Sequence, residues 1–245
     1  MPACFLPKRC LVVCCSLLIS ALSFAQQKDE LTYAVEWRLI RAGTAKISLE
    51  PVRSGWQGTV DLESAGLVSK LYPVSDHYTA QMTEGFCAAS TAMKAQEGSR
   101  RRETIVNYDR GRGMTSYVET DLVKNKTVSK ETGIPGCVHE WIGAIKTLRA
   151  TKMEPGQSET IPMSDGKKFA RVKIEAQDRE EVKTPLGAFK TIRHEAFFFD
   201  GALISRNARC FVWLTDDAKR TPVQIRVRLQ FLIGTITLQL EKEEH

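Results

Sequence analysis

Strict alternation of apolar and polar residues constrains the fold of this chain more than any other feature. The pattern recurs in five segments, residues 33–39, 45–49, 170–176, 223–231 and 236–240. Successive side chains of a strand point to opposite faces, so each segment predicts a strand with one apolar and one solvated face. Strands of this kind are typical of antiparallel sheets, because parallel strands are usually covered on both sides.

Short turn signals separate these segments at spacings of roughly 10–15 residues, which is typical of a meander. They lie at residues 42–43, 54–55, 109–113, 165–166, 185–187, 200–201 and 216–217. A sheet of about ten or more strands tends to curl into a barrel, an open half-barrel or two packed layers. The polar segment 120–132 is predicted to be a mobile hairpin or loop.

One amphipathic helix is predicted over residues 138–149. Its apolar residues follow helical spacing: Val138, Trp141, Ile142, Ile145 and Leu148. Glu140 lies in the first turn and Arg149 in the last, as the helix dipole favours. A short helical turn is also expected over residues 67–71. The predicted fold is therefore mainly β, an antiparallel meander curled into an open or half β-barrel around one amphipathic α-helix.

The first 25 residues are typical of a secretory signal peptide. Lys8 and Arg9 precede an apolar run over residues 10–22, and Ser23-Phe24-Ala25 supplies small residues at a cleavage site. The apolar run is too short to span a bilayer, and no later stretch approaches that length. We expect cleavage after Ala25, a single β-rich domain over residues 26–245, and a periplasmic location. No lipid anchor is expected at Cys14, because Val13 is bulky.

The charge balance argues against a nucleic-acid partner. The whole chain carries a formal charge of +6, and removal of Lys8 and Arg9 leaves 33 bases against 29 acids. A mixed surface of this kind lacks the concentrated basic footprint of a nucleic-acid-binding protein.

Three cysteines remain after the signal segment: Cys87, Cys137 and Cys210. In an oxidising compartment this number predicts one bridge and one free thiol. Cys87 and Cys137 each lie beside turn residues, whereas Cys210 lies within a strand pattern, so a Cys87–Cys137 disulfide is favoured. The alternative is three independent core thiols.

The sequence resembles an exported bacterial family catalogued as domain of unknown function 3108. The resemblance covers nearly the whole mature chain and depends on the order of several short segments. They are residues 31–35, 42–43, 66–76, 100–103, 108–109, 138–149, 182–189, 211–217 and 221–223. The resemblance implies a β-rich periplasmic fold. It supplies no catalytic residues, because the family has no assigned chemistry.

The final segment more distantly resembles the carboxyl-terminal hairpin of periplasmic lipoprotein carriers of the LolA type. In those carriers a strand ending in an aromatic residue and an aspartate turns into a Pro-Val strand. They form half-barrels that bind acyl chains against a helix-covered concave face. The resemblance is an analogy of fold, which is weak support for a function.

No catalytic, metal or cofactor motif is complete. His139-Glu140 begins like the zinc motif H-E-x-x-H, but Gly143 stands where the second histidine is required. The four histidines show no ligand spacing, and no serine elbow, P-loop or dinucleotide glycine pattern occurs. Asp76 and His77 are adjacent, and adjacent strand residues face opposite ways. We therefore predict no metal, no cofactor and no enzymatic activity.

Two segments are apolar on both faces, residues 210–214 and Phe197-Phe198-Phe199. Such a strand must be covered twice, by the core and by a helix, a loop, a partner or an acyl chain. Arg226 and Arg228 lie on the polar side of a regular strand and are expected to be solvated.

The favoured hypothesis is non-enzymatic binding of a hydrophobic or amphiphilic ligand, such as a lipid acyl chain, on the concave face of the sheet. The candidate wall residues are Trp37, Trp141, Ile145, Phe198, Phe211 and Trp213. The alternative is a scaffold whose apolar strands bind an envelope protein partner. A hydrolase of the cell envelope is the least favoured interpretation.

Overall fold

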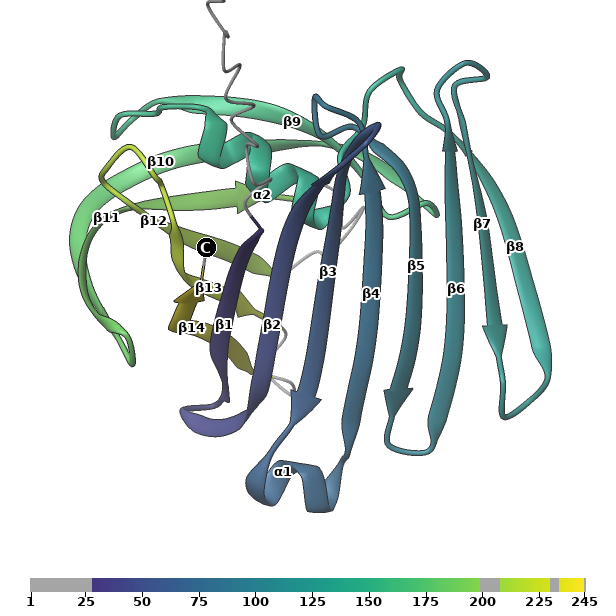
Figure 1. Ribbon diagram of the computed structural model, residues 1–245, viewed down its shortest axis with the longest axis horizontal. Helices are drawn as coiled ribbons and strands as arrows, with labels where there is room; N and C mark the ends of the chain where they lie inside the picture. The colour runs from purple at the N-terminus through teal and green to yellow at the C-terminus, as the bar shows by residue number, and fades with distance from the viewer. Residues whose placement is uncertain (1–27, 199–207, 230–233, 245) are drawn as a thin grey trace, which may run out of the picture.

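The computed structural model describes residues 28–198, 208–229 and 234–244 of the chain (Figure 1). The predicted signal segment lies outside these residues, as does Phe231 of one predicted strand. Over the described ranges, neither helix is long and apolar enough to cross a bilayer.

The described chain forms one 14-stranded antiparallel sheet that curls strongly without closing (Figure 1). Consecutive strands pair from β1 to β8 and from β9 to β14, and the pairing of β1 with β14 joins these two series. Strands β8 and β9 are left as the two sheet edges. The strands are β1 Asp29–Trp37, β2 Ile40–Val52, β3 Gly55–Ser64, β4 Val74–Met82, β5 Ala88–Glu97, β6 Arg100–Asp109, β7 Met114–Asp121, β8 Lys126–Gly133, β9 Ser158–Ser164, β10 Phe169–Thr184, β11 Gly187–Phe197, β12 Arg209–Thr215, β13 Pro222–Arg228 and β14 Thr235–Glu244. The predicted mainly β, open-barrel fold class is confirmed.

The polar segment 120–132 forms a regular hairpin, the first of the two alternatives predicted there. Strand β7 continues to Asp121, and β8 pairs with it from Lys126 onward. Nearly every residue of β8 is exposed, because this strand forms one edge of the sheet and no helix covers it. Because both faces of such a strand are exposed, its sequence shows no alternation of apolar and polar residues.

Both predicted helices are present. Helix α1, Gly66–Leu71, joins β3 to β4, and helix α2, Trp141–Ala150, joins the two sheet edges. Helix α2 begins later than the periodicity predicts because tertiary bonds hold the preceding backbone extended. The Val138 carbonyl accepts a bond of 2.8 Å from the Ala88 amide, and the His139 amide donates at 2.8 Å to Pro162.

Helix α2 lies across the mouth of the curled sheet, as Figure 1 shows. Leu148 packs into a core formed mainly by β9–β13, and Ile142 packs against Leu49 and Met82 on the opposite strands. Gly58 makes this approach possible, because a Cβ there would lie 2.7 Å from the Ile142 side chain. The apolar stripe of the helix therefore faces the concave side of the sheet, as predicted.

The β10–β11 hairpin is long and strongly curved (Figure 1), and β10 also contacts β13 and β14. At its tip, the Leu186 amide donates a hydrogen bond of 3.1 Å to the Leu240 carbonyl. Val182 and Phe189 from this hairpin join the same apolar cluster as Trp213. Strand β12 is therefore covered on both faces by residues of the chain itself.

The three cysteines behave as the favoured pairing predicts. The sulfur atoms of Cys87 and Cys137 lie at bonding distance, 2.08 Å apart, across a sequence separation of 50 residues. Cys210 is a free thiol, and burial raises its pKa to about 12.

Candidate functional site

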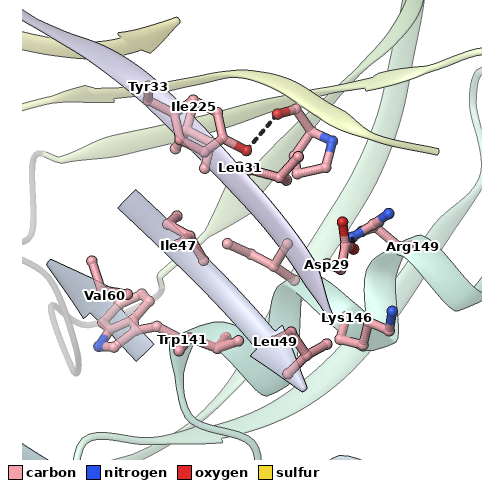
Figure 2. Close-up of a pocket in the computed structure, with 13 residues that line it drawn as sticks. Asp29, Leu31, Tyr33, Ile47, Leu49, Val60, Trp141, Lys146, Arg149 and Ile225 are labelled. Carbon is pink, nitrogen blue, oxygen red and sulfur yellow. Dashed lines mark hydrogen bonds and ion pairs between the residues drawn. The ribbon is translucent and has the colours of Figure 1, made fainter. Parts of the chain in front are cut away.

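An apolar pocket of about 120 Å³ lies between helix α2 and the concave faces of β1, β2 and β3 (Figure 2). We call it the helix pocket. Its lining residues are Asp29, Leu31, Tyr33, Ile47, Leu49, Val60, Trp141, Ile142, Ile145, Lys146, Arg149, Pro222 and Ile225. The Tyr33 hydroxyl donates a bond of 2.7 Å to the Pro222 carbonyl, so this polar group is satisfied within the wall.

The amino-terminal end of α2 is fixed by a buried carboxylate. Glu140 caps the helix, accepting bonds of 2.8 Å and 2.6 Å from the amides of Ile142 and Gly143. The Tyr78 hydroxyl donates to the same carboxylate at 2.9 Å. Burial raises the pKa of Glu140 above its ordinary value, and the three donors oppose this shift by stabilising the charged form. Helix α2 is thereby tied to strand β4 at its first turn.

His139 and Gly143 have structural roles in this helix start. The His139 Nδ1 atom lies 2.8 Å from the Phe86 carbonyl, and burial lowers its pKa. A Cβ on Gly143 would lie 2.6 Å from the same Phe86 oxygen, so no histidine fits at that position. The incomplete zinc motif is therefore part of a helix cap.

The carboxyl-terminal end of α2 is fixed by an ion pair. Arg149 Nη1 lies 2.7 Å from Asp29 Oδ2, and both side chains are largely buried (Figure 2). The Arg220 guanidinium donates to the Arg149 carbonyl, which ties the helix end to the β12–β13 turn. Because both of its ends are held by these contacts, α2 covers the apolar faces of β1–β3 in a fixed position.

Lys146 is a second cation at the pocket, and its surroundings differ from those of Arg149. Its ammonium lies 5.4 Å from the centre of the Trp56 ring and 5.9 Å from that of Phe86. Burial, with a smaller contribution from the nearby Arg149 charge, lowers its pKa. No carboxylate of the described residues lies within ion-pair distance of its ammonium. The apolar pocket thus has a half-buried positive charge at one side.

The structure divides the predicted wall residues among three places. Trp141 and Ile145 line the helix pocket, and the Phe198 ring packs 5.9 Å from that of Trp141. Trp37 lies at the far end of β1 and is 39% exposed. Phe211 and Trp213 lie outside the helix pocket, in a separate groove over β10–β13. Three of the six residues therefore gather at α2 and three do not.

Sequence reasoning missed the other residues of the pocket wall. Leu31, Ile47 and Leu49 occupy the apolar side of predicted strands, and that alternation was the available signal. Lys146 follows Ile145 directly on the predicted helix, but no local pattern separates it from a solvated lysine. Its role depends on the aromatic rings that β3 and the β4–β5 turn bring to it.

Other candidate chemistry is not assembled within the described residues. His77 pairs with Asp61 at 2.5 Å, whereas Asp76 accepts a bond from the Gln96 amide on the other face of the strand. In the ranges that the structure describes, no three His, Cys, Asp or Glu side chains gather as a metal site would require.

The comparisons with known proteins identify a family and a fold. A solved structure, the β-barrel-like protein of domain of unknown function DUF1849 from Brucella abortus, superposes with a TM-score of 0.57 at 8% identity. The alignment covers 89% of this chain and 98% of that chain, and at this identity it shows similarity of fold alone. No curated protein matches. The family model described as protein of unknown function (DUF3108) matches residues 32–241, so the chain belongs to that family.

Proposed function

We propose that this protein works without catalysis in the cell envelope, binding an amphiphile whose apolar part enters the helix pocket. The observation that carries the proposal is an apolar cavity beside the Lys146 ammonium, which pairs with no carboxylate of the described residues. Ligand sites are typically apolar hollows with a few polar groups that fix orientation. The apolar faces of strands β1–β3 form one side of the pocket, and helix α2 forms the other side and contributes the Lys146 ammonium.

The size of the pocket limits what it holds. A cavity of about 120 Å³ accepts a small ring or a few methylene groups. Each buried methylene contributes about 0.8 kcal/mol of transfer free energy. The proposed ligand therefore inserts a short apolar segment, and the remainder of a longer acyl chain lies outside the described pocket.

Lys146 sets the orientation of the proposed ligand. Arg149 is neutralised by Asp29 at 2.7 Å, so it offers little net charge to a ligand. The Lys146 ammonium lies against the Trp56 and Phe86 rings and, within the part of the chain that the structure describes, has no carboxylate at ion-pair distance. An anionic head group beside Lys146, with its tail under α2, would provide that missing partner. A fatty acid carboxylate has this chemistry.

The test compares decanoic acid with decanol, which share a chain length and differ in charge. Natively folded protein is titrated with each, and tryptophan emission reports binding because Trp141 lines the pocket. We expect both to bind and the acid to bind more tightly. A failure of both ligands, together with an empty organic extract of the purified protein, would overturn the proposal.

Two pairs of variants sharpen this test. Val60→Phe fills the pocket and should weaken both ligands, whereas Val128→Phe, on the exposed edge strand β8, should weaken neither. Lys146→Gln should lower the affinity for decanoic acid by about tenfold and leave decanol unchanged, since one charge-assisted contact is lost. Lys70→Gln, on the short helix α1, is the matched control.

The proposed location is the periplasm. A disulfide-bonded pair, Cys87 and Cys137, is the arrangement that persists in oxidising compartments. Cell fractionation with a mass measurement of the processed chain tests this location. A chain that retains residues 1–25 and stays with the cytoplasmic fraction would contradict it.

A second candidate function, a scaffold for an envelope protein, is favoured by the β1–β2 turn. Leu39 is 92% exposed and Ile40 is 57% exposed. Arg38 and Leu39 have φ values of 51° and 69°, which is costly for bulky residues. A photo-cross-linker at position 39 tests this role. A single envelope protein captured there, and lost in Ile40→Glu, would favour the scaffold.

A further inference from the structure

A second groove, of about 270 Å³, lies on the face of β10–β13 opposite the core beneath α2. We call it the arginine groove. Its lining residues are Gln177, Arg193, Arg209, Phe211, Trp213, Arg226 and Arg228. Strand alternation separates it from the helix pocket, because Val212 and Leu214 pack into the core beneath α2 while Phe211 and Trp213 point the other way.

Two buried aromatic rings form the floor of the arginine groove. The Phe211 and Trp213 ring centres lie 6.0 Å apart, and each side chain is at most 5% exposed. The Trp213 indole N–H donates a bond of 2.7 Å to Glu180, which fixes the ring in the wall. The floor is therefore rigid and apolar.

Two of the four arginines are neutralised by acids of the chain. Arg193 lies 2.9 Å from Asp178 and 3.4 Å from Glu180. Arg209 binds the buried Glu195 through two bonds, of 2.7 Å and 2.9 Å. These pairs frame the groove without adding a free charge.

Arg226 and Arg228 have no such partner among the residues that the structure describes. Their guanidinium carbons lie 5.0 Å above the Trp213 ring and 5.4 Å above the Phe211 ring. No carboxylate of the described residues lies within ion-pair distance of either group. Burial, and then the like charge of Arg228, lower the pKa of Arg226, while Glu180 and Glu36 oppose this shift from farther away. Two positive charges are thus held side by side.

Stacking on the floor leaves the N–H edges of these guanidinium groups available. A guanidinium presents a planar fork of donors that matches two oxygens of a phosphate or carboxylate. Two adjacent forks match a group that carries close to two negative charges and three free oxygens, which is a phosphate monoester. A carboxylate supplies half that charge.

We propose that the arginine groove binds a phosphate monoester group, held between Arg226 and Arg228 above the Phe211–Trp213 floor. The group belongs either to a small soluble phosphate or to the head of a membrane lipid. This site shares no lining residue with the helix pocket, so the inference does not depend on the proposed function.

The test uses inorganic phosphate by calorimetry and vesicles of phosphatidylcholine with and without phosphatidic acid by co-sedimentation. Binding of inorganic phosphate identifies a soluble source. Binding only to vesicles that contain phosphatidic acid identifies a lipid head group. Binding of neither would overturn the proposal, as would equal binding to both kinds of vesicle without phosphate binding.

The matched variants are Arg226→Gln/Arg228→Gln and Arg100→Gln/Arg101→Gln, which remove the same charge from two different strands. We expect the first to weaken binding by about tenfold or more and the second to leave it near that of the native protein. Arg228→Gln alone changes an exposed residue and provides a folded variant should the double variant unfold. If both double variants lost the same affinity for phosphate, the effect would come from net charge alone, and the proposal would be overturned.

Discussion

The helix pocket and the arginine groove each combine apolar side chains with cations, but in opposite arrangements. In the helix pocket, aliphatic residues face the empty space and one ammonium lies at the side. In the arginine groove, guanidinium groups cover the aromatic floor and face outward. The first arrangement favours an apolar ligand with an anionic end, and the second favours an anion alone.

The two sites also differ in what holds them together. The arginine groove is built on four adjacent strands, β10–β13, whose backbone bonds fix the positions of its side chains. The helix pocket needs α2 in place, and α2 is held by tertiary contacts at its two ends. Substitutions that remove the contacts at the ends of α2 should therefore weaken binding in the helix pocket and leave binding in the arginine groove unchanged.

The largest effect is expected from removing the disulfide. In the chain-entropy account, a bridge that closes a 50-residue loop contributes about 4 kcal/mol to the free energy of unfolding. Cys87→Ser/Cys137→Ser should lose roughly that amount in urea denaturation. Because Cys137 lies in the short segment that leads into the helix cap at Glu140, decanol binding should weaken while phosphate binding persists.

Cys210→Ser is the matched control, since it alters a thiol that forms no bridge. A double variant that loses both ligands equally would show that the two sites do not have separate supports. A double variant as stable as the native protein would show that contacts other than the bridge hold the start of α2.

The next effect in size is expected at the helix cap. Glu140→Ala removes the acceptor for two backbone amides and leaves the Tyr78 hydroxyl without its partner. Loss of a cap and of a buried partner should lower the free energy of unfolding by about 2 kcal/mol, measured in urea. Decanol binding should fall with it.

Two further variants test whether the helix cap supports the helix pocket specifically. Glu140→Gln keeps an acceptor of similar shape and should cost less. Glu180→Ala removes the acceptor of the Trp213 indole at 2.7 Å on the partly exposed hairpin, and should affect the arginine groove alone. If Glu180→Ala were the more damaging change for decanol binding, the assignment of separate supports would be wrong.

The sheet was predictable because its signal is local. Alternation places Tyr33 and Val35 on one face of β1 whatever the rest of the chain does. The contact between the first strand and the last strands of the chain is not local, since the Tyr33 hydroxyl bonds to Pro222 across 189 residues. The start of α2 shows the same limit, because Val138 fits the helical period but is held extended by bonding to Ala88.

The two sites were only partly predictable for a related reason. Trp141 and Ile145 follow from the apolar stripe of the helix, and both line the helix pocket. Phe211 and Trp213 were assigned to the same wall because a strand apolar on both faces does not reveal which face meets the ligand. Arg226 and Arg228 were expected to be solvated, and only the pairing of β13 with β12 brings them over those rings.

The smallest effect, about tenfold in affinity, is expected from pH, and it distinguishes the two kinds of cation. Burial holds the pKa of Lys146 below its ordinary value of 10.5. Its charge, and with it the preference for decanoic acid over decanol, is therefore present at neutral pH and lost as the pH rises through that lowered pKa. The nearby Arg149 and Asp29 side chains pair with each other at 2.7 Å.

Phosphate binding should not follow this pH dependence, because guanidinium groups remain protonated throughout the range. The measurement is a titration of each ligand from neutral pH to about pH 10, with circular dichroism to confirm that the protein stays folded. Lys146→Arg should carry the preference for decanoic acid to higher pH. Parallel loss of decanoic acid, decanol and phosphate would mean that the alkaline change acts on the fold, and that Lys146 does not set the orientation of the ligand.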